Sequence, residues 1–292
     1  MKLSDDIIIC GKRAIARSFA KINLTLDIAG NRPDGYHSLE SVMQTVGLCD
    51  MVIVDKTPYE RKITTNKKFL PTNEKNLAYK ACEAFYTHFG KNGGAKILIH
   101  KNIPVAAGLA GGSGNAAAVL AALNMLWANP FSDEELCKIG VEIGADVPFC
   151  LMGSTQKASG IGDVLTPLSD MPKCYVLLVT PPIQVSTQWA YKAFDEEQCA
   201  SHSMTEKMEE ALQNGDYYAV CDSLSNDLEA VTVKKYPVIR GIKEKMILNG
   251  ANGALMSGSG STVFGLFDDY KKAKASHDSF ALMYKDVFLA TI

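Results

Sequence analysis

Residues 104–118 read PVAAGLAGGSGNAAA, and the fold and function of the chain are decided by this stretch. It follows a strand-like segment at residues 95–100 and leads into an apolar helix that we expect to end before Asn129. Side chains this small let a chain of phosphates approach the backbone N–H groups, and the start of the following helix adds further unpaired donors and partial positive charge. Composition alone leaves an alternative open, because a glycine-rich turn also lets a helix pack closely against its neighbours.

Two better-known phosphate motifs do not account for this segment. A Walker A loop needs a Gly-Lys-Ser/Thr triplet, and the segment contains no lysine. Gly112, Gly114 and Ala117 fit the dinucleotide pattern GxGxxA, but the acids about twenty residues further on, Glu134 and Glu135, fall at the start of a capped helix. We therefore interpret the dinucleotide match as accidental.

Composition limits the class of protein. The 292 residues are 47% hydrophobic and 21% charged, with a formal net charge of −2. No global field would draw such a chain to nucleic acid or to an anionic membrane, so we expect neither partner. The eight cysteines show no CxxC pair and the five histidines no metal-ligand spacing. With no apolar run long enough for a signal peptide or a membrane span, we expect a cytoplasmic protein with free thiols and no protein metal site.

The remaining chain mixes strands and helices without a strict βαβ order, which favours an α+β fold. We expect strands at 21–28, 51–55, 175–180 and 253–256, the first with an apolar and a polar face. A helix over 76–89 should stop at Gly90, and capping boxes at Ser132 and at Ser203 should open two more helices. The boundary between two lobes is expected within residues 154–170.

The segment from Pro104 to Ser113, followed by Asn115, resembles the phosphate-binding motif of the GHMP kinases. Residues 20–24 (AKINL) and 253–264 (GALMSGSGSTVF) are similar to the other two motifs of that superfamily and occur in the same order. The resemblance implies a two-lobed fold, with a ribosomal protein S5 domain 2-like ATP-binding lobe at 1–165 and a ferredoxin-like lobe at 166–292. It also implies that ATP binds on the loop through Pro104, Gly108, Leu109, Ala110, Gly111, Gly112, Ser113 and Gly114.

Other phrases resemble one branch, the 4-diphosphocytidyl-2-C-methyl-D-erythritol kinases. They are AKINL with GNRPDGYH at 30–37, GADVPF at 144–149 and SNDLE at 225–229. This resemblance implies transfer of the γ-phosphate of ATP to the 2-hydroxyl of that substrate, in non-mevalonate isoprenoid biosynthesis. Alternatives are a sister kinase for phosphomevalonate or homoserine, a non-enzymatic nucleotide-binding protein and, more remotely, a dinucleotide oxidoreductase.

The resemblance also assigns roles to residues. Asp146 would accept or orient the hydroxyl proton, and Lys21 would hold Asp146 ionised and offset charge on the transferring group. Tyr36 and Tyr191 would sandwich the cytosine. The other residues expected to contact the substrate are Asn23, His37, Thr187, Gly258 and Ser259. Without the motifs, Lys21 would be interpreted as part of a solvated strand face and Asp146 as a turn residue.

Several features stay open at this level. Mg²⁺ is expected with ATP, but the sequence names no carboxylate ligand, and Ser113 is only a candidate. Phe19, Gly114, Asn115 and Ser154 depart from the family pattern, and we expect Asn115 to remove a charge near the phosphates. We expect a monomer or a weak homodimer.

Overall fold

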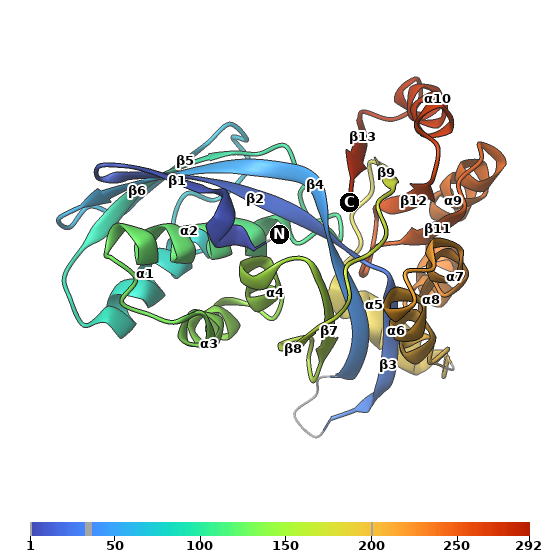
Figure 1. Cartoon of the computed structure of the whole chain (residues 1–292), viewed down its shortest axis with the longest axis horizontal. Helices are drawn as coiled ribbons and strands as arrows, with labels where there is room; N and C mark the ends of the chain where they lie inside the picture. Colours follow the sequence, from blue (N-terminus) through green and yellow to red (C-terminus); the bar gives the residue numbers. More distant parts are fainter. Residues whose placement is uncertain (1, 33–36, 200) are drawn as a thin grey trace. The chain divides into compact units, whose positions relative to one another are not determined.

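The computed structural model describes residues 2–32, 37–199 and 201–292 (Figure 1). Strands and helices are mixed along the chain, as the α+β prediction requires. The described chain divides into two compact units, one of residues 1–20, 49–105 and 110–154 and the other of residues 21–48, 106–109 and 155–292. Strands β2 (Arg13–Asn23) and β4 (His37–Thr57) run from one unit into the other. The single boundary expected after residue 165 stays a prediction.

The first unit places helices against one face of its strands (Figure 1). Strand β1 (Ile7–Cys10) pairs with the start of β2, and the end of β4 pairs with β6 (Gly94–His100), which pairs in parallel with β5 (Lys62–Thr65). The helices are η1 (Leu3–Asp6), α1 (Leu77–Phe89), α2 (Gly111–Leu126), α3 (Asp133–Ile143) and α4 (Val147–Met152).

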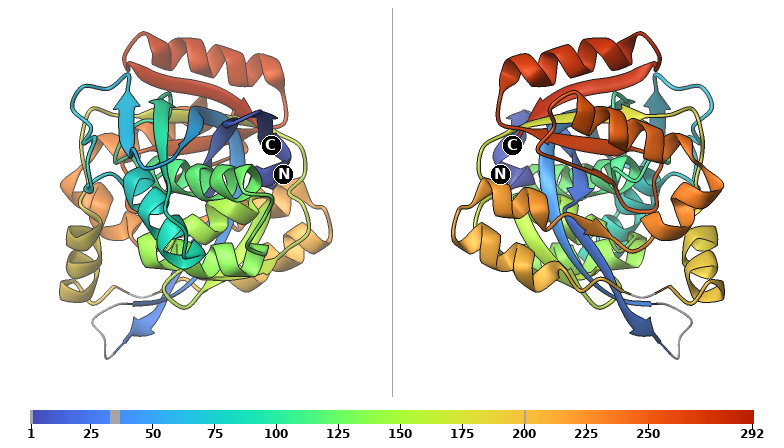
Figure 2. Two further views of the ribbon diagram at one scale, coloured as in Figure 1. Left: turned by 90° about the vertical axis from the view of Figure 1, so that its left-hand side faces the viewer. Right: turned by 90° about the vertical axis from the view of Figure 1, so that its right-hand side faces the viewer.

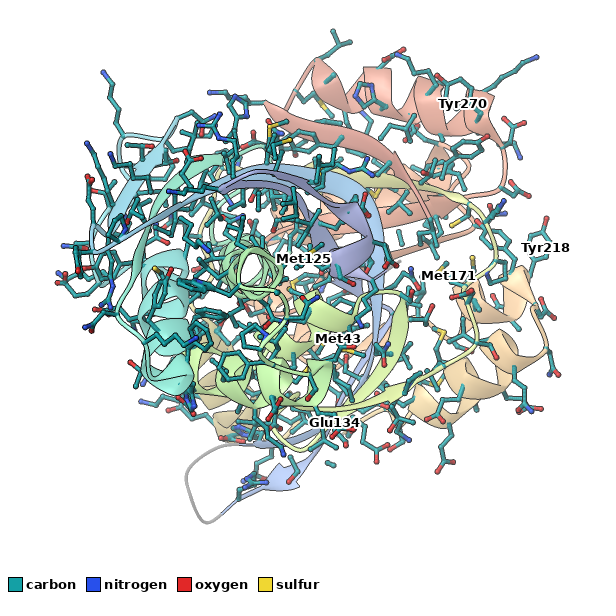
Figure 3. All side chains as sticks on the ribbon, turned by 60° about the vertical axis from the view of Figure 1, so that its left-hand side comes forward. Met43, Met125, Glu134, Met171, Tyr218 and Tyr270 are labelled. Atoms are coloured by element: carbon teal, nitrogen blue, oxygen red, sulfur yellow. The ribbon has the colours of Figure 1, made fainter. Side chains whose placement is uncertain are left out.

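Helix α2 runs through the core of this unit. Twelve of its residues are buried, on every side of the helix, which is typical of a helix enclosed by other elements. Figure 3 views this helix nearly along its axis, with Met125 near its end and side chains packed around it. Because α2 is held on all sides, its first turn has a fixed position within the unit.

Two helix boundaries in the first unit follow the sequence signals. Asn76 accepts a hydrogen bond from the N–H of Ala78 and caps α1, and Gly90 ends that helix with φ 65°. Ser132 and Glu135 form the expected capping box of α3, with both reciprocal bonds present. The predictions for these two helices are confirmed.

The second unit contains a four-stranded antiparallel sheet in the order β11-β12-β9-β13. Its strands are β9 (Tyr175–Thr180), β11 (Gly253–Met256), β12 (Val263–Phe267) and β13 (Asp286–Thr291). Helix α9 (Val238–Leu248) precedes β11, and α10 (Tyr270–Ala281) precedes β13 and lies beside it (Figure 2). With residues 187–235 inserted between β9 and α9, these elements form the strand–helix–strand–strand–helix–strand pattern of a ferredoxin-like fold, as predicted.

The rest of the second unit is built around the first half of β4, which pairs with β3 (Thr25–Asn31) and with β7 (Thr155–Ser159). The neighbouring strands are β8 (Val164–Pro167) and β10 (Ser225–Asn226). The helices are α5 (Thr187–Glu196), α6 (Thr205–Gln213), α7 (Tyr217–Asp222) and α8 (Glu229–Lys235). Tyr218 on α7 and Tyr270 on α10 point outward (Figure 3).

One prediction for this unit is confirmed in part and one is wrong. The residues expected as a strand over 21–28 are strand except for Leu24, which separates the end of β2 from the start of β3, and the polar residues Lys21, Asn23, Thr25 and Asp27 are as buried as the apolar ones. The capping box expected at Ser203 is absent, because α6 begins at Thr205 and the N–H of Thr205 donates to the carboxylate of Asp27 at 2.8 Å.

No helix within the described ranges has the length and apolar character needed to cross a membrane.

Candidate active site

The first turn of α2 presents backbone donors. Ala110, with φ 54°, stands at the N-cap, and the first bond along the helix runs from the N–H of Gly114 to its carbonyl at 2.8 Å. The N–H groups of Gly111, Gly112 and Ser113 therefore come before the first intrahelical donor, Gly114, and have no carbonyl acceptor within the helix. The turn carries no acidic side chain. Such a turn is suited to an anion, because free N–H groups and the positive end of the helix dipole coincide.

The three glycines of this turn differ in what surrounds them. A Cβ atom on Gly111 would lie 2.9 Å from Nζ of Lys101, and one on Gly114 would lie 2.6 Å from Oγ of Ser18. Gly112 is exposed, and its Cβ would meet nothing nearer than a methyl of Leu77 at 3.5 Å. Gly111 and Gly114 thus let protein atoms approach the turn from behind, while Gly112 leaves its outer side open. A side chain at position 114 would require the hydroxyl of Ser18 to move.

A buried polar network lies behind the turn. Asn115 accepts a hydrogen bond from Nζ of Lys101 at 3.1 Å and donates to Oδ2 of Asp50 at 2.9 Å and to Oγ of Ser18 at 3.3 Å. Lys101 and Asp50 also form an ion pair. Burial lowers the pKa of Lys101, and the Asp50 carboxylate opposes that shift. The side chain of Asn115, which departs from the family pattern, is buried and hydrogen-bonded inside the protein.

Asp146 occupies the N-cap position of α4 in the same unit, where it is partly buried. Its carbonyl accepts from the N–H of Cys150 at 3.1 Å, so the helix fixes its backbone. The turn before it lies close to the first turn of α2, because a Cβ atom on Gly144 would be 4.0 Å from Oγ of Ser113. The structure thus brings the segment carrying Asp146 to the first turn of α2.

Lys21 lies in the second unit, at the end of β2. Its Nζ donates to Oδ1 of Asn23 at 2.7 Å, and Nδ2 of Asn23 donates to Oγ of Ser41 at 2.8 Å. The backbone N–H of Lys21 also donates to the carbonyl of Leu109 at 3.2 Å. Lys21 is only 5% exposed, so the simple interpretation as a solvated strand lysine is excluded. The hydrogen bond with Asn23 fixes the direction of the ammonium group.

Two glycine-rich segments meet in this unit. Oγ of Ser257 donates to the carbonyl of Gly108 at 2.9 Å, and the N–H of Thr262 donates to the carbonyl of Ala107 at 3.2 Å. Gly108 has φ 76°, and a side chain there would collide with the carbonyl oxygen of Ser257. A Cβ atom on Gly258 would lie 3.5 Å from Oδ1 of Asn23. The loop over 257–261 therefore packs between Gly108 and the Lys21–Asn23 pair.

Residues expected to contact the substrate lie in two groups of the second unit. His37 stacks on Tyr191, with ring centroids 4.8 Å apart, and its Nε2 lies 2.9 Å from Oδ1 of Asp195. The hydroxyls of Thr187 and Ser259 share a hydrogen bond of 2.9 Å. Tyr36, the other residue expected to stack on cytosine, lies outside the described residues.

Comparisons with known proteins agree with these motifs. Residues 76–154 match the GHMP kinases N terminal domain, and residues 208–285 match GHMP kinases C terminal. A 4-diphosphocytidyl-2-C-methyl-D-erythritol kinase from Clostridium beijerinckii is 45% identical over 273 residues, which cover 94% of this chain and 98% of the relative. The chain belongs to the 4-diphosphocytidyl-2-C-methyl-D-erythritol kinases of the GHMP superfamily. The predicted family is confirmed.

Further relatives of this GHMP kinase point the same way. The enzyme of that name from Alkaliphilus oremlandii is 46% identical over 280 residues, which cover 95% of this chain and 96% of the relative. A crystal structure of 4-(cytidine 5'-diphospho)-2C-methyl-D-erythritol kinase is 31% identical, with a TM-score of 0.79 and coverage of 95% and 98%. Homoserine kinase from Cytophaga hutchinsonii, at 18% identity, has a TM-score of 0.72 over 98% of this chain and 95% of its own and shows the shared fold alone.

Two residues of the phrase SNDLE had no predicted role and contact the segment 256–258. Asn226 was part of a family phrase, yet its Nδ2 donates to the carbonyls of Met256 at 2.8 Å and Gly258 at 2.7 Å. Glu229 of the same phrase accepts from the N–H of Met256 at 3.0 Å. Only the phrase itself signals this in the sequence, because both contacts reach a loop about thirty residues away.

Within the described residues, no group of three or more His, Cys, Asp and Glu side chains is placed to hold a metal ion. Of the loop residues expected to bind ATP, Pro104 is half-buried and Leu109 is buried.

Proposed function

We propose that this kinase transfers the γ-phosphoryl group of ATP to the 2-hydroxyl of 4-diphosphocytidyl-2-C-methyl-D-erythritol. The observation that carries the proposal is the similarity to enzymes of that name, at 45% identity and over 98% of the relative's length. The motifs for both ends of the reaction are present in this chain, from AKINL to the loop at 257–261.

ATP would be held by the loop that runs from Pro104 into the first turn of α2. The amides of Gly111, Gly112 and Ser113 would face the phosphates, and the open side of Gly112 supports this orientation. Mg²⁺ would accompany ATP, and the hydroxyl of Ser113 is a suitable hard oxygen ligand for it. When bound, Mg²⁺ supplies charge neutralisation on the phosphate oxygens.

Transfer of a phosphoryl group needs positioning and charge stabilisation more than covalent chemistry. Asp146 would accept the proton of the attacking hydroxyl or orient that hydroxyl. Lys21 would offset charge on the transferring group, and Asn23 would aim its ammonium through the 2.7 Å hydrogen bond. Lys21 and Asp146 come from different units, so this pairing is part of the proposal.

The cytidine end would be recognised by aromatic and polar side chains. Tyr191 and Tyr36 would stack on the base, with His37 at its edge, and a stacked base is worth about 1–3 kcal/mol. Asp195 would fix the ring of His37, because it already contacts Nε2. Thr187, Gly258 and Ser259 would contact the rest of the acceptor, supported by the hydrogen bond between the two hydroxyls.

A coupled assay of ADP release tests this function. The wild-type enzyme, with ATP and Mg²⁺, is given 4-diphosphocytidyl-2-C-methyl-D-erythritol, phosphomevalonate, mevalonate and homoserine in parallel. We expect turnover only with the first, and a phosphorus spectrum of the product should place the new phosphate on the 2-hydroxyl. If the enzyme phosphorylates another acceptor and does not phosphorylate 4-diphosphocytidyl-2-C-methyl-D-erythritol, the proposal is overturned.

We further propose that the enzyme works in the cytoplasm as a monomer or weak homodimer, without nucleic acid or membrane partners. The formal charge of −2 supports the lack of nucleic acid and anionic membrane partners, because it provides no strong field for polyanions. Light scattering across a range of enzyme concentrations would measure the assembly.

A further inference from the structure

The network behind the first turn of α2 is more strongly charged than packing requires. Asp50, Lys101 and Asn115 are 0%, 4% and 4% exposed. Replacing a buried ion pair by apolar residues of similar size is often neutral for stability or favourable to it. An ion pair at this place in the fold therefore calls for an explanation beyond stability.

We propose that Asp50, Lys101 and Asn115 are positioning residues for ATP, which fix the first turn of α2 and place a positive charge behind it. The inference rests on the proposed function only in that ATP binds at this turn. It does not depend on which alcohol is phosphorylated.

The network connects three segments that build the phosphate site. Asp50 lies on β4, Lys101 directly follows β6, and Asn115 is in the second turn of α2. Oδ1 of Asp50 accepts from the N–H groups of Asn102 and Ile103, both at 2.8 Å. One carboxylate therefore holds the chain just before Pro104 and, through its other oxygen, the helix after the loop. The two ends of the loop are fixed to a common point.

The ammonium group of Lys101 lies on the side of the network that faces α2. Its Nζ is the heavy atom nearest to a Cβ position on Gly111, at 2.9 Å, so the positive end of the ion pair faces the first residue of α2. A cation buried behind these amides adds to their attraction for an anion in front of them, and low exposure to water limits its screening. Only glycine at 111 allows this approach without displacing the ammonium group.

Asn115 suits the network because an amide both accepts and donates. Its oxygen accepts from Lys101, and its nitrogen donates to Asp50 and to Ser18. An apolar residue of the same size would leave Lys101 and Asp50 each with one partner fewer, in a place that water does not reach. The amide thereby completes the network without adding a charge.

The test compares ATP binding in variants of the full-length enzyme. Lys101→Met leaves Asp50 unpaired and is expected to destabilise the fold, so the decisive variant is Asp50→Asn/Lys101→Met. There Asn at position 50 keeps an oxygen for the two backbone N–H groups and no charge remains buried. The control is Lys96→Met, which removes an exposed lysine on β6, the strand that Lys101 follows; Lys96 pairs with Glu60.

We measure the affinity for ATP by titration calorimetry in the presence of Mg²⁺ and the cooperativity of unfolding by thermal melting. We also measure the KM for ATP and the KM for the alcohol. We expect the double variant to melt cooperatively, to bind ATP about tenfold more weakly or worse and to keep the KM of the alcohol within about twofold. Lys96→Met should match the wild type in all of these.

Equal ATP affinity in a folded double variant would overturn the inference, as would a parallel rise of both KM values, which indicates general loosening. If the wild type binds ATP but does not phosphorylate the proposed alcohol, the proposed function fails and the inference is judged on ATP binding. A wild type that does not bind ATP overturns the inference itself.

Discussion

The side-chain amide of Asn226 donates to the carbonyl oxygen of Gly258 at 2.7 Å, across 32 positions of the chain. The same nitrogen donates to the carbonyl of Met256, while the oxygen of the amide accepts from the N–H of Leu228. One buried side chain thus holds both the strand end and the glycine-rich loop that packs on Asn23.

Asn226→Asp should loosen this loop. The carboxylate has no hydrogen to donate, so two carbonyls lose their donor and face a negative charge. Each buried group left unpaired costs about 1–3 kcal/mol. We expect a clear loss of stability in urea unfolding and a raised KM for the alcohol, larger than the change in KM for ATP.

Asn252→Asp is the matched control. Asn252 uses its oxygen to accept from the hydroxyl of Tyr217 at 3.1 Å and from the N–H of Asp268 at 3.2 Å. The carboxylate retains that acceptor, so both KM values should stay close to those of the wild type. If Asn226→Asp behaves no differently from this control, the loop does not depend on Asn226.

Local signals in the sequence predict elements whose partners are also local. The box of Ser132 and Glu135 opens α3 because both partners lie within one turn of each other. Ser203 and Glu206 have the same spacing, yet α6 begins at Thr205, whose N–H is satisfied by Asp27 of β3. A pattern of four consecutive residues cannot predict a hydrogen bond to a carboxylate 178 positions away.

Burial of polar residues could not be read from alternation either. Lys21, Asn23 and Thr25 alternate with apolar residues, and without the family motifs such a polar face would be interpreted as solvated. They are buried because Asn23 bonds to Ser41 and Thr25 bonds to Thr205, both non-local partners. The family phrases at 20–24 and 225–229 include Asn23 and Asn226, which make such long-range contacts, whereas periodicity gives no sign of them.

Gly108→Ala should weaken the enzyme through backbone strain and a steric clash together. Gly108 has φ 76°, and the added methyl group would press on the carbonyl oxygen of Ser257. Overpacking of this kind costs about 1–3 kcal/mol, in addition to the cost of positive φ. We expect a lower unfolding midpoint in urea and a raised KM for ATP, because Gly108 belongs to the loop proposed to bind it.

Gly90→Ala separates the two effects. Gly90 also has a positive φ, 65°, but nothing lies within 4 Å of its Cβ position at the end of α1. It should show the conformational cost alone, with both KM values unchanged. Equal losses in the two variants would mean that the contact between Gly108 and Ser257 is unimportant.

Asp146→Asn should remove turnover while leaving the fold and ATP binding intact. The amide keeps the shape of the carboxylate at the start of α4, and the backbone contact to Cys150 does not involve the side chain. It cannot accept a proton from the attacking hydroxyl, a contribution worth about 10²–10⁴ in rate. We therefore expect kcat to fall by about that factor, with melting temperature and ATP affinity close to the wild type.

Asp133→Asn, on an exposed residue in the first turn of α3, is the control and should retain full kcat. Undiminished turnover in Asp146→Asn would exclude Asp146 as the group that receives or orients the hydroxyl proton, and loss of ATP affinity alone would assign it to nucleotide binding instead.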